Sequence, residues 1–330
     1  MLSGLLLAVI SGIANGLFSA PMKIIRKWRW ENIWLVFILI ACLAMPLGIV
    51  LAENAGLPFA ILRAMPFAPL TYALLFGFAW GFGAILFGRS VDRLGVSLAN
   101  SLVIGISSAL GSLVPVLFDP AWKPDFKFAI LLSGVVVFLA GVALCGSAGR
   151  LRRPKMESGG ASFAAYLLCV GAGVMSAVFN IGYTLALPMA DAGVHQGMTR
   201  FAATNLIWLL MLGAGSLPNI AYCTWLMRRH SSAPLLLAHG ASASWALALA
   251  MGLLWGGSIF LYGAATPRLG HLGPSIGWPL SLAVGLLVAN LMGLLLGEWR
   301  DAPGPAISRM RFGILTLLAA ILLCSWSASI

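Results

Sequence analysis

The polar side chains that could do chemistry in this sequence are mainly amides and hydroxyls set within long apolar runs. Asn15 and Ser19 are four residues apart, and Ser176 and Asn180 have the same spacing in the second half of the chain. Residues four apart share one face of a helix. An amide in apolar surroundings is costly unless it is hydrogen-bonded. These faces therefore either line a polar cavity that binds hydroxyl groups or join helices to one another.

Aromatic side chains accompany these amides, and such rings combine flat apolar faces with a polar tip. A sugar ring can stack its C–H faces on them while amides bond its hydroxyls, although each ring could equally be packed in a core. We predict a substrate site formed by the following residues: Asn15, Ser19, Trp80, Asn100, Ser176, Asn180, Trp255, Tyr262 and Trp278.

The titratable residues form neither a catalytic cluster nor a metal-binding one. All nine carboxylates fall outside the long charge-free runs, and the five cysteines lie inside them without disulfide or metal spacing. An enzyme would need clustered acids, histidines or nucleophiles, so we expect no enzyme, no metal and no cofactor. Proton coupling needs a titratable group, although a lone loop histidine is more often simply solvated. The candidates are Asp191, His195, His239 and His271.

The overall composition places these residues in a membrane protein. Apolar residues make up 61% of the 330 residues, charged residues make up 9%, and the mean hydropathy is +0.99. Soluble domains carry about 25% charged residues. The net charge of +11 is dispersed in short clusters rather than gathered on one face, as nucleic-acid binding requires. The composition excludes an ordinary soluble domain, a disordered chain and a nucleic-acid reader.

Charge-free runs define the expected transmembrane segments, because a helix needs roughly 20 apolar residues to cross a bilayer. The runs do not alternate between apolar and polar residues, as the strands of a barrel would. The ten runs cover residues 1–22, 32–52, 64–88, 94–118, 128–149, 158–190, 201–227, 230–267, 269–297 and 312–330. We expect ten transmembrane helices.

Lysine and arginine are unevenly distributed among the connections between these runs. The odd-numbered connections carry 15 of them and the even-numbered connections carry 5. Because cytoplasmic loops hold the excess, we expect the odd connections in the cytoplasm and both termini outside. The first run has no positive charge before it, so we expect a retained helix rather than a cleaved signal peptide.

The two halves of the sequence repeat. Residues 77–95 and 252–270 align without a gap, and a weaker alignment pairs residues 6–19 with 167–180. The recurring residues of the stronger alignment are Gly77, Trp80, Gly81, Gly88, Arg93, Leu94 and Gly95, matched by Gly252, Trp255, Gly256, Gly263, Arg268, Leu269 and Gly270. Five helices fall in residues 1–148 and five in 161–330, around a cytoplasmic linker at 149–160. Because five is an odd number, the second half would enter the membrane from the opposite side, and such inverted repeats are typical of secondary transporters. The alternative is a duplication in a membrane enzyme or channel.

Three segments carry motifs of one family. They read A-P-M-K-I-I-R-K-W-R-W-E-N-I-W at 20–34, F-G-F-A-W-G-F-G followed by R-L-G-V-S within 76–97, and L-L-G-E-W-R-D-A at 295–302. These segments resemble the bacterial L-rhamnose–proton symporters, and the similarity is looser around the sixth, seventh and ninth helices. The resemblance implies the drug/metabolite transporter fold, with ten helices in two inverted halves. It also implies uptake of a 6-deoxyhexose, driven by protons, across the bacterial inner membrane.

Together these features predict a secondary transporter that takes up a small neutral sugar, L-rhamnose or a related deoxy-sugar, by proton symport with alternating access. The alternatives are an exporter or exchanger of another small metabolite in the same superfamily, and a polytopic membrane enzyme. The expected partners are the sugar, protons and the lipid bilayer, with no nucleic acid. The sequence does not determine the oligomeric state.

Overall fold

The computed structural model describes residues 1–53, 62–63, 65–94, 96–116, 124–152, 163–295 and 299–329, and this part is almost entirely helical. Short 3-10 segments connect several of the helices: η1 (Pro21–Lys23), η4 (Ala233–Leu237) and η5 (Thr266–Leu269). The main helices are α1 (Leu2–Leu17), α2 (Trp30–Ile38), α3 (Met45–Glu53), α5 (Phe67–Leu94), α6 (Val96–Val116), α7 (Phe126–Arg152), α8 (Phe163–His195), α9 (Arg200–Arg229), α10 (Ser242–Ala265), α11 (Gly273–Leu295) and α12 (Gly304–Ser329).

The described helices are long and apolar enough for a membrane. Eight of those searched could span a bilayer, and two shorter apolar helices cover Leu2–Leu17 and Leu102–Val116. The helices follow the charge-free runs of the sequence, with α2 and α3 forming one segment over Trp30–Glu53. The prediction of an all-helical polytopic membrane protein is confirmed.

The segment Trp30–Glu53 is continuous but irregular. Between α2 and α3 it makes a π turn, η2 (Leu39–Ala44). Pro46 accounts for the irregularity, because proline has no N–H to donate to the carbonyl of Cys42 and its ring crowds that carbonyl. A π bulge of this kind absorbs the mismatch without ending the helix. The irregular turn packs against α10.

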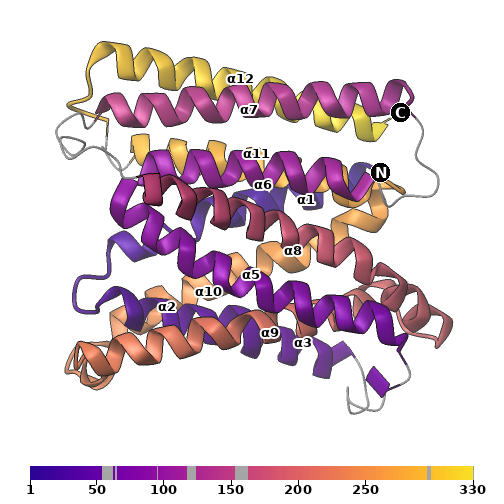
Figure 1. Cartoon of the computed structure of the whole chain (residues 1–330), viewed down its shortest axis with the longest axis horizontal. Coiled ribbons are helices and arrows are strands. Elements are labelled where there is room, and N and C mark those ends of the chain that lie inside the picture. The colour runs from indigo at the N-terminus through magenta and orange to yellow at the C-terminus, as the bar shows by residue number, and fades with distance from the viewer. Residues whose placement is uncertain are drawn as a thin grey trace.

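The helices form a layered bundle (Figure 1). Helices α7 and α12 pair along one edge, and α2, α3 and α9 lie along the opposite edge. Between them α1 packs against α10 and α11, while α8 packs against α5 and α6. Both termini lie at one end of the bundle, which we call the terminal end. The connections 18–29 and 230–241 lie at the other, the basic end.

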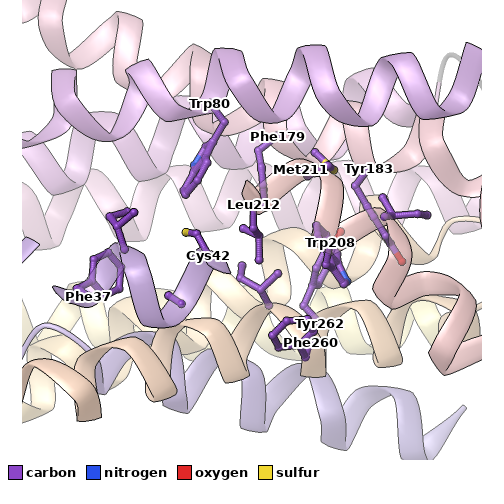
Figure 2. Close-up of a cluster of buried hydrophobic side chains, with 14 of the residues drawn as sticks. Phe37, Cys42, Trp80, Phe179, Tyr183, Trp208, Met211, Leu212, Phe260 and Tyr262 are labelled. Carbon is purple, nitrogen blue, oxygen red and sulfur yellow. The ribbon is translucent and has the colours of Figure 1, made fainter. Parts of the chain in front are cut away.

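A cluster of buried side chains fills the space between α2, α5, α8, α9 and α10. Figure 2 shows its aromatic members, which come from several helices and point toward one another. Trp208 stacks on Tyr183 with ring centroids 4.3 Å apart and on Phe179 at 5.5 Å. This aromatic layer borders the cavity described below.

Repeated glycines mark the closest helix approaches in both halves. A Cβ added to Gly77 of α5 would meet the backbone oxygen of Met211 on α9. A Cβ added to Gly252 of α10 would lie 2.7 Å from Cβ of Ile40 in η2. Small residues let helix backbones come this close. The glycine signature of the sequence therefore packs α5 on α9 and α10 on the Trp30–Glu53 segment.

Candidate substrate-binding cavity

A cavity of about 220 Å³ lies within the bundle, between helices α1, α2, α5, α6, α8, α10 and α11. Its wall is mostly apolar and carries a few polar groups, which is the usual composition of a small-molecule site. The aromatic residues in the wall are Phe18, Trp34, Phe37, Trp80, Phe87, Phe179, Trp255 and Trp278. The residues with polar side chains that share it are Ser11, Asn15, Ser19, Ser176, Ser258, Tyr262 and Ser281.

The structure brings most of the predicted substrate residues together around this cavity. Those in its wall are Asn15, Ser19, Trp80, Ser176, Trp255, Tyr262 and Trp278. Asn180 is buried next to the wall rather than in it, and the side chain of Asn100 lies outside the described part of the chain. Substrate contact by these residues stays a prediction, but their convergence from five separate helices is now a structural observation.

Several serines of the wall are engaged in hydrogen bonds that fasten the helices. The hydroxyl of Ser11 donates to the carbonyl of Ser258 at 2.8 Å and lies 2.9 Å from the hydroxyl of Ser281. The hydroxyl of Ser107 donates to that of Ser176 at 2.8 Å. These bonds join α1 to α10 and α11, and α6 to α8. The packing interpretation of the sequence therefore applies to Ser176.

Other polar groups in the wall have no hydrogen-bond partner among the described residues. They are the side chains of Asn15 and Ser19 and the indole N–H groups of Trp80 and Trp255. An asparagine amide offers two donor hydrogens and an acceptor oxygen. Asn15 is therefore the group best able to bond a hydroxyl of a ligand in this cavity.

Stacked aromatic rings form one side of the cavity. Trp80 and Trp255 lie almost parallel, with ring centroids 5.3 Å apart and an interplanar angle of 11°. Phe179 packs on Trp80 at 4.9 Å, and Phe37 meets Trp255 edge to face at 5.7 Å. Trp80 and Trp255 occupy equivalent positions of the sequence repeat. The repeated tryptophan thus places one ring from each half in direct contact at the cavity.

Toward the terminal end the cavity is closed by a polar layer, formed by Asn180, Tyr183, Tyr262 and Thr266. The hydroxyl of Tyr262 donates to Oδ1 of Asn180. The amide nitrogen of Asn180 donates to the carbonyl of Gly111 at 2.7 Å and, more weakly, to that of Pro274 at 3.3 Å. Asn180 therefore holds Tyr262 in place and ties α8 to α6 and α11.

The second hydrogen bond of the polar layer joins the hydroxyls of Tyr183 and Thr266, which are 2.6 Å apart. Beside the layer, the indole of Trp278 donates to the carbonyl of Ser107 at 3.2 Å. The four side chains of the layer are at most 2% exposed. In the opposite direction the wall continues to Ser19 and Trp34, next to the connection 18–29. The cavity thus extends toward the basic end and is sealed from the terminal end.

The sequence analysis did not single out Ser11, Trp34, Phe37 or Ser258 as site residues. Spacing could have found two of them, because Ser11 precedes Asn15 by one turn and Ser258 follows Trp255 by one turn. Trp34 and Phe37 enter the cavity because α2 lies beside α10 and α9, which no sequence spacing predicts. The indole of Trp34 also donates to Oδ1 of Asn219 on α9 at 3.0 Å.

The predicted proton-coupling candidates lie at the surface and none of them lines the cavity. Asp191 forms an ion pair with Arg200, and His195, His239 and His271 have exposed side chains. Among the described residues, no group of three or more histidines, cysteines or carboxylates could hold a metal ion. The role of Asp191, His195, His239 and His271 in proton coupling stays a prediction, which their position at the surface does not test.

Glu31 is a titratable residue that the sequence analysis did not consider for the site. It begins α2, yet it is only 3% exposed. Its Oε1 accepts a hydrogen bond from the Ser232 hydroxyl at 2.8 Å and lies 3.0 Å from Nδ1 of His230 and 3.2 Å from Nε of Arg29. Glu31 therefore joins α2 to the segment after α9. One turn further along α2, Trp34 lines the cavity.

A bundle of long apolar helices of this kind defines the class of polytopic membrane proteins, and here the bundle holds a solute-sized cavity. Comparison with known proteins identifies the family. The model of the L-rhamnose-proton symport protein (RhaT) family matches residues 1–328. The chain belongs to this family, as its sequence motifs suggested.

Named relatives extend over almost the whole chain. The L-rhamnose-proton symporter of Cronobacter sakazakii is 29% identical over 334 residues, which is 96% of this chain and 95% of the relative. The L-rhamnose-proton symporter of Klebsiella pneumoniae subsp. pneumoniae is 27% identical over 336 residues, with the same coverage. Both are named as transporters rather than enzymes.

A solved structure, described only as the crystal structure of a protein, shares the fold. The alignment covers 99% of this chain and 98% of the solved chain, with a TM-score of 0.60 and 12% sequence identity. The helix arrangement therefore occurs in a protein whose sequence has diverged widely from this one.

Proposed function

We propose that this protein takes up L-rhamnose, or a closely related deoxy-sugar, together with protons across the bacterial inner membrane. The observation that carries the proposal is the cavity, whose wall includes both the stacked rings of Trp80 and Trp255 and the amide of Asn15, which has no hydrogen-bond partner among the described residues. A deoxy-sugar presents hydroxyls on some carbons and apolar C–H and methyl groups on others. Amides suit the first and aromatic rings the second. Membership in the family and the names of the relatives support the same substrate.

We infer that the two halves form inverted repeats, 1–148 and 161–330, joined by a linker at 149–160. The packing supports this reading, because several helix pairs recur when the halves are exchanged. Helix α1 packs on α10 as α8 packs on α5, and α1 packs on α11 as α8 packs on α6. The stacked pair of Trp80 and Trp255 would then lie on the axis that relates the halves. In transporters of this design the substrate binds at such an interface.

The orientation in the membrane follows from charge. The connection 18–29 holds four lysines and arginines, so the positive-inside rule places the basic end in the cytoplasm and both termini in the periplasm. The cavity then reaches toward the cytoplasm, and the polar layer closes it against the periplasm. This arrangement corresponds to the inward-facing member of an alternating-access pair.

Proton coupling needs a group whose charge changes the contacts between moving parts. Besides Asp191, His195, His239 and His271, the structure offers Glu31, a buried carboxylate that joins the halves one turn from the cavity. In the state described here its oxygens accept from Ser232 and face Arg29, as suits an ionised carboxylate. Protonation would weaken the contacts of Glu31 with Ser232 and His230 of the second half and so free α2 to move against that half.

The experiment that tests the function is uptake of labelled L-rhamnose into proteoliposomes, with and without an inward proton gradient. Gradient-dependent accumulation supports symport. Accumulation without any response to the gradient, or none with rhamnose or its 6-deoxy relatives, contradicts the proposal. If the proton gradient instead drives solute loaded inside the vesicles out of them, and no uptake is seen, the protein is an exporter.

Variants assign the roles within the same assay. Asn15→Leu is expected to raise KM by about tenfold, because a hydrogen bond to the sugar is lost, while Asn290→Leu, outside the cavity wall, is the matched control. Glu31→Gln is expected to abolish gradient-driven accumulation but to retain exchange of labelled for unlabelled sugar. Normal accumulation by Glu31→Gln would return the proton role to the four surface candidates.

A further inference from the structure

A second cavity, of about 250 Å³, lies at the terminal end where α9 begins and α10 ends. It shares no residue with the wall of the substrate cavity. We call it the arginine cavity, and its wall is formed by Arg200, Phe201, Thr204, Gly263, Ala264, Pro267 and Arg268. Neither the sequence motifs nor the transport function accounts for it.

Three hydrogen-bond donors on one face of α9 have no acceptor in the described structure. They are Nε of Arg200, the hydroxyl of Thr204 and the indole N–H of Trp208, spaced four residues apart. Thr204 is 2% exposed and lies in the wall of the cavity. The Trp208 indole packs against the backbone of Gly263, another wall residue. Buried polar groups are rarely left unpaired, so this row indicates a missing acceptor.

The charge at the cavity is positive. Arg268, from η5, contributes a second guanidinium, one nitrogen of which donates to the carbonyl of Ala264. Asp191 pairs with Arg200, so two cations and one carboxylate leave a net charge of about +1. The cavity also adjoins the first turn of α9, where the helix dipole favours an anion. The unpaired donors, the net positive charge and the first turn of α9 each favour a negatively charged ligand that supplies acceptors only.

We propose that the arginine cavity binds a phosphate oxyanion, supplied by the headgroup of a phospholipid. Guanidinium groups match the geometry of phosphate oxygens, and the hydroxyl of Thr204 adds a donor beside them. A neutral sugar fits less well, because its hydroxyls also need acceptors. The cavity lies at the ends of two membrane-crossing helices, at the level where headgroups are found. A bound phosphate would join α9 to α10 next to the polar layer.

The test uses the purified, delipidated full-length protein in a neutral detergent. Phosphatidylglycerol, diacylglycerol and inorganic phosphate are added separately, and the melting temperature and the lipid retained in native mass spectrometry are measured. We expect phosphatidylglycerol to raise the melting temperature and to be retained, and diacylglycerol to do neither. Stabilisation by inorganic phosphate but not by phosphatidylglycerol would support a site for a phosphate oxyanion and contradict the lipid headgroup as its source.

Variants locate the effect. Arg268→Gln and the nearly isosteric Thr204→Val are each expected to weaken binding about tenfold, because a hydrogen bond to a charged group is lost. Arg63→Gln, an exposed arginine near the start of α5 at the same end, is the matched control and should bind normally. Equal stabilisation by diacylglycerol, or an equal loss in Arg63→Gln, would overturn the proposal. These readouts do not depend on transport.

Discussion

The two ends of the substrate cavity are unequal, although repeated sequence forms both. Toward the terminal end, Tyr262 and Asn180 are hydrogen-bonded and seal the cavity. The repeat places Phe87 and Ser19 at the equivalent positions toward the basic end, and both line the open part of the cavity. A phenylalanine ring cannot donate to a serine hydroxyl as a tyrosine hydroxyl donates to an amide. Aligned segments of the two halves thus close one end of the cavity with a hydrogen-bonded pair of side chains, whereas Phe87 and Ser19 form no such pair among the described residues.

Breaking the stronger closure should give the largest effect. Asn180→Leu removes three hydrogen bonds and leaves the hydroxyl of Tyr262 with only the long contact to the carbonyl of Pro274 at 3.4 Å. We therefore expect uptake to fall by roughly a hundredfold, corresponding to about 2–3 kcal/mol for a buried network. The protein should still reach the membrane. Initial uptake rates in vesicles, normalised to the amount of protein, measure the effect.

The milder substitution Tyr262→Phe separates gating from folding. It keeps the ring and removes only the hydroxyl, so a smaller loss in the same direction is expected. Unchanged uptake in both variants would mean that the polar layer is packing and not part of the transport cycle.

Building the missing closure should give an intermediate effect. The double substitution Ser19→Asn with Phe87→Tyr reproduces, at the basic end, the pair formed by Asn180 and Tyr262 at the terminal end. If the aligned residues of the two halves are equivalent, the new hydrogen bond closes the basic end of the cavity and lowers uptake several-fold, since one hydrogen bond contributes about 1 kcal/mol. Each single substitution serves as a control, and a double variant no slower than the singles would argue against equivalence.

The two glycine contacts offer a direct comparison of the halves through stability, with the smallest effect expected on uptake itself. Gly77→Ala would press a methyl group on the backbone of Met211, which cannot yield, whereas Gly252→Ala meets the side chain of Ile40. We expect both to destabilise by about 1–3 kcal/mol, as overpacking does, with Gly77→Ala the worse. Thermal unfolding in detergent measures this, and Gly213→Ala, with open space around its Cβ position, should be neutral.

Much of the fold could be predicted from the sequence. Long charge-free runs specify helices in lipid because backbone groups there must pair within the segment, and each run became a helix. The irregularity before Pro46 follows from the chemistry of proline, although its form as a π turn was not predicted. The alignment of the two halves pairs Trp80 with Trp255, and the structure stacks these two rings on one another.

The sequence also predicted most of the polar and aromatic residues that lie at the cavity. It did not predict which of them are hydrogen-bonded to neighbouring helices. Asn15 and Asn180 have similar sequence surroundings, because each is an amide within an apolar run. Only the neighbours on other helices distinguish them: Asn180 finds two backbone carbonyls and a tyrosine, whereas Asn15 finds none among the described residues. Glu31 could not be singled out from the sequence, because its burial depends on Ser232 and His230, about 200 residues away.

By itself, the sequence predicted a membrane protein with many apolar helices and with similar segments in its two halves, since hydropathy, charge and sequence similarity are local properties. Only the tertiary structure decided which polar groups are occupied, which end of the cavity is sealed and where donors lie without acceptors. Hydrogen bonding depends on what stands opposite a side chain, and that is settled by helix packing rather than by the order of residues.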